Sequence, residues 1–515
     1  MKTWHMALAC LSVACILNSA AGAEEKRAIQ PEDLVDIRSV SDVQISPDGK
    51  RVAFVVTEPA DPKKPQQARD SNIWIVPADG SEPPRIFAAS SKKESQPRWS
   101  PDGSYLAFLS DRGQPVGEEK EAKPQLYLMR TDGGEAEQLT NLKGEVLALR
   151  WSPDGKAIAF TVRDPKSEAE QKKQKDGYDD IDVDHDYKFA RLWVTTLVDR
   201  KQEQVTKQDI EVSEMTWSPD GSELALMVSS THRNDDIYWH SKLVVVRRLT
   251  GEITRTLTDA AADISGSLGW SPDGKLISTG LFTPDGISAW LSLIPAEGGA
   301  ARPILKDYRG TIWGVEWTPD SRTLIAQSIE GTQAKLLSID SSSGAVTKLG
   351  DSSVRGQNFS VSADGRTIAY LQQPAESPGD VWLMTLGQSP RRATNIHTQV
   401  ATWRLGAMKE ITWKNKKDGL TMYGVLITPP DFKAGQAYPT IVQVHGGPMG
   451  AWSSAWQGSW HDWGHFLASN GYVVFLPNPR GSTGQGWQFA EANRDDWGGM
   501  DFQAIKSGVD YLVEQ

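Results

Sequence analysis

The chain has 515 residues, enough for about three domains of ordinary size. Its formal net charge is −11 and it has no block of lysine and arginine, which argues against nucleic acid as a partner. With 39% apolar residues and a mean hydropathy of −0.44, the composition is that of a globular chain. It excludes the disordered, collagen-like, coiled-coil and polytopic membrane classes.

The N-terminus has the pattern of a secretory signal peptide. Lys2 precedes a run of 12 apolar or small residues at positions 6–17, and Ala21 and Ala23 form an A-x-A cleavage pattern. The run is too short to span about 30 Å of hydrocarbon. We therefore predict a signal peptide over residues 1–23, export across the inner membrane to the periplasm, and no membrane contact after cleavage.

Both cysteines, Cys10 and Cys15, lie inside this leader. The mature chain then has no cysteine, which fits a bacterial periplasm and excludes a thiol nucleophile and a cysteine-ligated metal. We expect no metal ion and no cofactor.

A Ser-Pro-Asp-Gly turn recurs along most of the chain, with its aspartates 44 to 66 residues apart. It begins at Ser46, Ser100, Ser152, Ser218 and Ser271, and degenerate copies begin at Thr318 and Ser362. Proline presets φ, aspartate can bond the local backbone, and glycine tolerates a positive φ. Each copy therefore predicts a tight turn between two antiparallel strands.

Every copy has the same surroundings. A short strand precedes the turn and usually ends in tryptophan, an alternating apolar strand such as residues 156–160 follows it, and a third strand such as residues 125–129 comes later. Several repeats add a fourth short strand. Four antiparallel strands per repeat of about 50 residues predict a seven-bladed β-propeller over residues 24–398, with the tryptophans packed between blades. The pattern at 283–286 follows Asp273 too closely to begin a blade, so it predicts a loop within the fifth one.

The third repeat carries an insertion at residues 163–190, which contains five aspartates and a histidine within residues 178–186. The register of a calcium loop is missing. We interpret the segment as a solvated loop. The alternative is a carboxylate cluster, including Asp182 and Asp184, that meets the amino group of a substrate or the neighbouring domain.

The composition changes after Asn395. The pattern predicts a hairpin over 410–428, a strand buried on both faces over 438–444, a helix near 456–468, a second buried strand over 471–477 and a helix over 498–515. Hairpin, strand, helix, strand and helix are the opening of an α/β sheet.

Three motifs in this part resemble the prolyl oligopeptidase family of serine peptidases, and most of all its acylaminoacyl-peptidase and dipeptidyl-peptidase branches. They are His-Gly-Gly-Pro at 445–448, Asn-Pro-Arg-Gly-Ser-Thr-Gly at 478–484 and Asp-Trp-Gly-Gly-Met-Asp at 496–501. The resemblance covers essentially the whole mature chain. It implies a multidomain fold, in which the seven-bladed β-propeller is followed by an incomplete α/β-hydrolase domain, the N-terminal half of a peptidase domain, over residues 399–515.

The resemblance also implies a mechanism, which is acyl transfer by a Ser-Asp-His triad on short peptides, with the propeller limiting access. By position, Gly447 would donate its backbone N–H to the oxyanion and Gly446 would allow the close backbone approach. His445 is interpreted as a loop-ordering residue, because the catalytic base comes last along the chain in this fold. Arg480 is either a structural or a subsite-lining cation.

A Gly-x-Ser-x-Gly nucleophile motif occurs nowhere in the 515 residues, and the chain ends in the helix that would precede it. We interpret the chain as a C-terminally truncated copy that lacks the catalytic triad, and we expect it to be inactive alone. An unfinished sheet should also expose a strand edge and an apolar face, which favours aggregation.

The alternative function is a non-enzymatic periplasmic propeller that acts as a protein-binding scaffold. It gives no reason for His-Gly-Gly-Pro followed by a buried strand, helix and strand. The residues leave open whether the activity is that of an endopeptidase, a dipeptidyl-peptidase or an acylaminoacyl-peptidase, and they leave the oligomeric state open.

Overall fold

The computed structural model describes residues 25–61, 63, 69–117, 121–178, 187–262, 266–284, 286, 288–352, 358–447, 449–459 and 461–515. The predicted signal peptide and both aspartates singled out in the insertion, Asp182 and Asp184, lie outside these ranges. Within the ranges, none of the helices has the length and apolar character needed to cross a membrane.

The Ser-Pro-Asp-Gly turns form as the sequence predicts. In the first copy, Ser46 Oγ donates to Asp48 Oδ1 (2.6 Å), and the same oxygen accepts from Lys50 N (3.1 Å). Gly49 has a φ of +70°. In the degenerate sixth copy the glycine position is Ser321, which adopts a φ of +57°. Each turn therefore closes on its own aspartate and positions the strands on either side.

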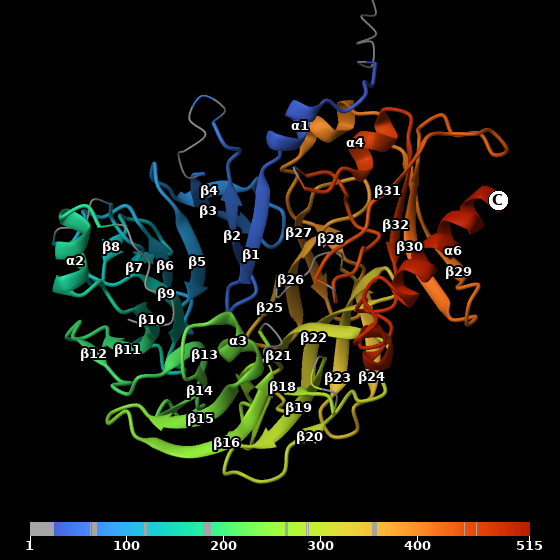
Figure 1. Cartoon of the computed structure of the whole chain (residues 1–515). Coiled ribbons are helices and arrows are strands. Elements are labelled where there is room, and N and C mark those ends of the chain that lie inside the picture. Colours follow the sequence, from blue (N-terminus) through green and yellow to red (C-terminus); the bar gives the residue numbers. More distant parts are fainter. Residues whose placement is uncertain are drawn as a thin grey trace, which may run out of the picture.

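Strands β1 to β28 form six sheets around a ring in the described part of the chain (Figure 1). Five are four-stranded and antiparallel, with strands in chain order. The first two hold β1 (Ser39–Ile45), β2 (Arg51–Thr57), β3 (Ser71–Pro77), β4 (Arg85–Ala88), and β5 (Glu94–Trp99), β6 (Tyr105–Ser110), β7 (Gln125–Arg130), β8 (Glu137–Gln138). The others hold β9 (Val146–Trp151), β10 (Ala157–Arg163), β11 (Ala190–Thr196), β12 (Gln202–Gln204), then β21 (Thr311–Trp317), β22 (Thr323–Glu330), β23 (Gln333–Asp340), β24 (Val346–Asp351), and β25 (Phe359–Val361), β26 (Thr367–Gln372), β27 (Asp380–Thr385), β28 (Arg391–Arg392).

The sixth sheet has eight strands and joins two sets of four. It holds β13 (Glu211–Trp217), β14 (Glu223–Ser229), β15 (Ser241–Arg247), β16 (Ile253–Ala262), β17 (Gly269–Trp270), β18 (Leu276–Phe282), β19 (Ala289–Pro295) and β20 (Arg302–Pro303). The two sets merge because the long strand β16 pairs with β18 through Ala261 and Ala262. The propeller is confirmed, and the number of its blades stays a prediction. The pattern at 283–286 falls between β18 and β19, as a loop.

The recurring tryptophans pack between neighbouring sets of strands, as the repeat predicts. Four of the indole N–H groups donate to a backbone carbonyl in the first strand of the preceding set. The pairs are Trp99 to Gln44 (2.9 Å), Trp151 to Arg98 (3.0 Å), Trp217 to Arg150 (3.2 Å) and Trp317 to Gly269 (3.3 Å). Trp270 differs, because it donates to Gly274 O in its own turn (3.0 Å). Packing between the sets of strands therefore explains the recurring tryptophans without a bound ligand.

The C-terminal part forms one four-stranded sheet with the order β29-β30-β32-β31. Its strands are β29 (Ala407–Lys414), β30 (Thr421–Thr428), β31 (Thr440–Val442) and β32 (Val473–Asn478), and only β31 and β32 pair in parallel. The helices of the chain are α1 (Pro31–Val35), α2 (Glu168–Lys175), α3 (Asn234–Trp239), α4 (Gly464–Ser469), α5 (Trp487–Ala490), α6 (Met500–Glu514) and the 3-10 helix η1 (Thr398–Thr402). This α/β unit lies beside the propeller (Figure 1).

Two sequence predictions for the α/β unit are wrong in detail. The helix expected near 456–468 is only α4, Gly464–Ser469, because Trp456 and Gln457 are buried in an irregular segment. The strand expected to be buried on both faces is the short edge strand β31, in which Ile441 is 37% exposed. An apolar sequence run indicates a tendency to be buried, but burial of a strand's faces depends on which segments cover the sheet.

Helix α6 covers one face of this sheet. Trp413 Nε1 donates to Ala504 O (2.9 Å), and a Cβ on Gly508 would lie 2.6 Å from the Phe475 ring. Glycine at this position therefore allows the helix to approach the sheet closely. Phe502 and Val513, on the same helix, are 55% and 84% exposed. The edge strand β31 and these side chains agree with the expected exposed edge and apolar face.

The tip of the β22–β23 hairpin docks on the α/β unit. Thr332 is fully buried, and both its N–H (3.1 Å) and its hydroxyl donate to Glu410 Oε2 on β29. The Thr332 carbonyl accepts from Ser454 N (2.8 Å). Gly331 N donates to Gly484 O (2.7 Å). These bonds hold the propeller against the loops that follow β31 and β32.

Residues before the first propeller strand also pack on the α/β unit. Ile29 N donates to Ser469 Oγ at the end of α4 (2.8 Å), and Asn470 Nδ2 donates to Ile29 O (2.9 Å). Ile29 and Trp403 are buried in one apolar cluster with Trp456. The N-terminal segment therefore links the two parts of the molecule.

His465 in α4 makes the stability of the α/β unit depend on pH. It is buried, its Nδ1 accepts from Gln457 N (3.0 Å), and burial lowers its pKa from 6.5 to about 4. Between these values the unfolded chain binds more protons than the folded one, so acidification favours unfolding. From pH 7 to pH 5 this histidine should cost about 2 kcal/mol of unfolding free energy.

The measurement is urea unfolding at both pH values. His465→Gln should lose about 2 kcal/mol less than the wild type on acidification. His461→Gln, a change at an exposed histidine in the same unit, should behave like the wild type. An equal pH dependence in all three proteins would contradict the prediction.

Candidate active site

The His-Gly-Gly segment begins three residues after the last residue of β31. Gly447 has a φ of +127°, and a Cβ at this position would lie 2.9 Å from Gly450 N. A Cβ on Gly446 would meet nothing within 4 Å. The backbone at Gly447 therefore requires glycine, both for its conformation and for its close approach to Gly450. The structure places the crowding at Gly447 rather than at Gly446.

His445 fixes the orientation of the peptide between these two glycines. Its Nδ1–H donates to Gly446 O (3.1 Å), and its Nε2 accepts from Ser482 Oγ (2.8 Å). The carbonyl and the N–H of one peptide unit point in opposite directions. The Gly447 N–H therefore points away from the histidine, and it donates to no acceptor among the described residues. This geometry agrees with the interpretation of His445 as a residue that orders the loop.

The segment that begins at the last residue of β32 makes hydrogen bonds to the same loop. Ser482 is fully buried, so the hydroxyl that binds His445 is shielded from water. Asn478 is also fully buried, and its side chain accepts from Trp452 N (2.7 Å) and donates to Trp452 O (2.9 Å). The Asn-Pro-Arg-Gly-Ser-Thr-Gly motif therefore bonds to the chain on both sides of the Gly446–Gly447 peptide.

Arg480 pairs with Asp418 in the turn between β29 and β30. Its side chain is only 11% exposed. Burial tends to raise the pKa of Asp418, but the Leu420 amide and the Arg480 guanidinium outweigh this effect and hold that pKa below its usual range. Of the two predictions for Arg480, the ion pair favours the structural one.

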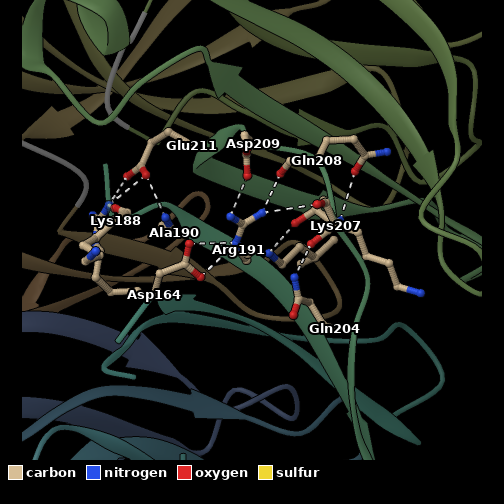
Figure 2. A network of polar contacts seen from close by, with 12 residues as sticks. Asp164, Lys188, Ala190, Arg191, Gln204, Lys207, Gln208, Asp209 and Glu211 are labelled. Carbon is tan, nitrogen blue, oxygen red and sulfur yellow. Dashed lines mark hydrogen bonds and ion pairs between the residues drawn. The ribbon is translucent and has the colours of Figure 1, made fainter. Parts of the chain in front are cut away.

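The ends of the insertion in the third repeat are held by ion pairs and hydrogen bonds. Figure 2 shows Arg191 between Asp164 (2.8 Å) and Asp209 (2.9 Å), with Glu211 close by. Glu211 accepts from Ala190 N (2.7 Å) and also pairs with Arg163. These contacts join the two ends of the insertion to the next set of strands.

Helix α2, which lies within this insertion, has no buried residue and lies across the molecule from β29 to β32 in Figure 1. The role of Asp182 and Asp184 stays a prediction, because both fall outside the described residues.

Several residues of this region were not singled out from the sequence. Ser482 and Asn478 belong to a motif that was recognised, but only the fold shows that they meet His445 and Trp452. Glu410 and Thr332 are 78 positions apart, and Glu491 reaches across to Thr283 and Ser288 of the propeller. No local sequence signal could have found these pairs, because each joins distant parts of the chain.

The comparisons with known proteins agree with this architecture. The TolB beta propeller domain family matches residues 39–184, and the Prolyl oligopeptidase family matches residues 460–515. An uncharacterized peptidase of Bacillus subtilis, YuxL, is 29% identical over 95% of this chain and 76% of its own length. Dipeptidyl-peptidase 5 of Porphyromonas gingivalis is 26% identical over 100% of this chain and 77% of its own length.

Among solved structures, an acylaminoacyl peptidase of Pyrococcus horikoshii is similar, with a TM-score of 0.71 and 19% identity over 95% of this chain and 72% of that one. At this identity the likeness shows a shared fold. The match over residues 460–515 covers the second half of the α/β unit, from α4 to α6, for which a propeller scaffold gave no reason. On these findings the α/β unit matches the Prolyl oligopeptidase family of serine peptidases over residues 460–515, and the chain as a whole is similar to bacterial peptidases.

Proposed function

We propose that the α/β unit supplies the oxyanion-binding loop of a peptidase that hydrolyses short peptides, with the Gly447 N–H as donor. The observation that carries the proposal is the orientation of the Gly446–Gly447 peptide. His445 holds its carbonyl, so its N–H points the other way and is unpaired among the described residues. A donor that is oriented before the reaction stabilises the charge that develops on a substrate carbonyl.

Gly446 has a different proposed role, which is to leave space beside this donor. It is exposed and has open space where a side chain would be, which leaves room beside the donor for a substrate carbonyl. Arg480 is assigned to the structural support of this region because of its ion pair with Asp418. The 515 residues contain no Gly-x-Ser-x-Gly motif, so the nucleophile of the triad is not identified among them.

The proposed substrates are short peptides, because the propeller lies against the loops of the α/β unit and restricts access to them. The docking of Thr332 and Gly331 on residues next to the oxyanion loop supports this restriction. Peptides are also the substrates that the name of the similar dipeptidyl-peptidase 5 indicates. The predicted signal peptide would bring the enzyme to peptides in the periplasm.

We further propose that this polypeptide by itself does not cleave peptides, since it contains no nucleophile motif. The test is hydrolysis of fluorogenic dipeptides by the purified 515-residue chain, with and without a serine-directed phosphonate. We expect no phosphonate-sensitive hydrolysis, and such hydrolysis would refute the proposal of inactivity.

The peptidase proposal is tested separately by the DNA downstream of codon 515. An open reading frame that encodes Gly-x-Ser-x-Gly within a few tens of residues would support it. A downstream sequence that encodes no such motif would count against it.

A further inference from the structure

A polar pocket of about 310 Å³ lies between the first sheet of the propeller, β1 to β4, and the last sheet, β25 to β28. One wall is formed by the β1–β2 turn and the end of β3, and the other by β26, β27 and the turn that follows β27. Its polar lining includes Lys50, Asp79, Thr385, Gln388, Ser389 and Arg391. Because these side chains offer both charge and hydrogen bonds, the pocket is suited to a small polar ligand.

This pocket lies at the end of the propeller sheets that faces away from the α/β unit. Successive turns of an antiparallel sheet in chain order lie at opposite ends of that sheet. In the sheet β21 to β24, the β22–β23 turn carries Thr332, which docks on the α/β unit. The β1–β2 turn, which carries Lys50, corresponds to the β21–β22 turn at the other end. The pocket is therefore separate from the proposed oxyanion loop.

The two walls of the pocket belong to sheets that close the ring side by side (Figure 1). In the described part of the chain, no strand is shared by the first and the last sheet. Ile45 N donates to Ser360 Oγ (2.6 Å), and Ala363 N donates to Pro47 O (3.0 Å). An apolar cluster with members from both sheets lies at the same junction. A ligand that contacts both walls would therefore strengthen the closure of the ring.

Two cations line opposite walls of the pocket. Lys50 belongs to the first sheet and Arg391 to the last, and neither forms an ion pair among the described residues. Asp79 also lines the pocket, and its Oδ1 accepts from Ser81 N (2.9 Å). Two cations and one carboxylate leave the lining with one positive charge. This charge matches a carboxylate better than a phosphate group, which carries about −1.5 to −2 at pH 7.

We propose that this pocket binds a small hydroxylated carboxylate, such as a sugar acid, and that the ligand bridges the first and last sheets. The carboxylate would meet Lys50 and Arg391, while the hydroxyl groups would bond to Asp79, Thr385 and Ser389. The volume is at the lower end of the range of about 300–1,000 Å³ for small-molecule sites, so there is room for one such molecule. The inference does not depend on the proposed peptidase function.

The experiment measures binding of gluconate to the 515-residue chain by isothermal titration calorimetry at constant ionic strength. Sorbitol, a neutral polyol of the same chain length, is the matched probe. Gluconate should bind one per chain with a Kd of about 1 mM or less, and about 10- to 100-fold more tightly than sorbitol. Equal affinities, or no saturable binding of gluconate up to about 20 mM, would overturn the proposal. Tighter binding of inorganic phosphate than of gluconate would overturn the assignment of a carboxylate.

Three variants test whether the binding belongs to this pocket. Lys50→Ala and Arg391→Ala each remove an exposed cation, so both should fold and should weaken gluconate binding about 10-fold or more. Lys156→Ala is the matched control, because Lys156 occupies the same position after the turn of the third repeat, is exposed and does not line the pocket. Unchanged affinity in either pocket variant, or an equal loss in the control, would contradict the proposal.

Hydrogen exchange tests whether the ligand bridges the two sheets. The amides of Ile45 and Ala363 bond across the junction, so gluconate at about ten times its Kd should slow their exchange by up to about 10-fold. The amide of Val205, which bonds to Leu192 within the third sheet, should change less. Gluconate binding that left the exchange of Ile45 and Ala363 unchanged would contradict the bridge.

Discussion

Gly447→Ala is expected to destabilise the α/β unit by about 1–3 kcal/mol and to displace the proposed oxyanion loop. The φ of +127° lies in a region that alanine strongly disfavours, and the new Cβ would stand 2.9 Å from Gly450 N. The backbone must therefore move, and the peptide that His445 orients would move with it. The measurement is thermal unfolding together with hydrogen exchange of the loop amides.

Gly446→Ala is the matched control, because a Cβ at that neighbouring position meets nothing within 4 Å and the φ of Gly446 is not positive. Its unfolding free energy should stay within about 1 kcal/mol of the wild type. The interpretation of the loop would be wrong if the two alanine variants had the same stability and the same exchange rates.

Asn478→Ala is expected to cost about 2–5 kcal/mol, more than a typical single substitution. The wild-type side chain satisfies both the N–H and the carbonyl of Trp452, and all of these groups are inaccessible to water. Alanine would leave two buried backbone groups without partners, at about 1–3 kcal/mol each. Chemical unfolding monitored by tryptophan fluorescence measures the loss.

The control for this variant is Asn395→Ala. Asn395 is exposed and accepts one hydrogen bond, from Arg392 (2.7 Å), so its loss should change stability by about 0.5 kcal/mol or less. If Asn478→Ala were no more destabilising than this control, the bridge to Trp452 would not be what holds the Asn-Pro-Arg-Gly-Ser-Thr-Gly segment in place.

The propeller could be predicted from sequence because its determinants are local. A turn such as Ser46 to Gly49 closes through bonds within a few residues, and its glycine adopts the positive φ that the pattern requires. The same turn and tryptophan recur at similar spacing, so the sequence repeat indicates that similar sheets pack against one another. The merging of two sets of strands through β16 was not visible, because it depends on how far one strand extends beyond its neighbour.

The α/β unit could be predicted only in outline. The order of its strands and helices followed from the apolar pattern, and the motifs at 445–448 and 478–484 pointed to the loops proposed as the site. The pattern over 438–444 predicted a strand covered on both faces, but Ile441 of β31 is 37% exposed. Periodicity indicates which side chains tend to be buried, whereas their actual burial depends on which other segments pack against them.

By itself, the sequence determined a repeating β-propeller followed by an α/β unit, and it identified His445, Gly446 and Gly447 as the residues of interest, because these features are written in short stretches of chain. Only the tertiary structure decided that Ser482 holds His445, that Asp418 pairs with Arg480, and that the first and last sheets of the propeller enclose a polar pocket. The physical reason is that each of these contacts joins residues from distant parts of the chain, whose meeting depends on how the sheets and loops pack.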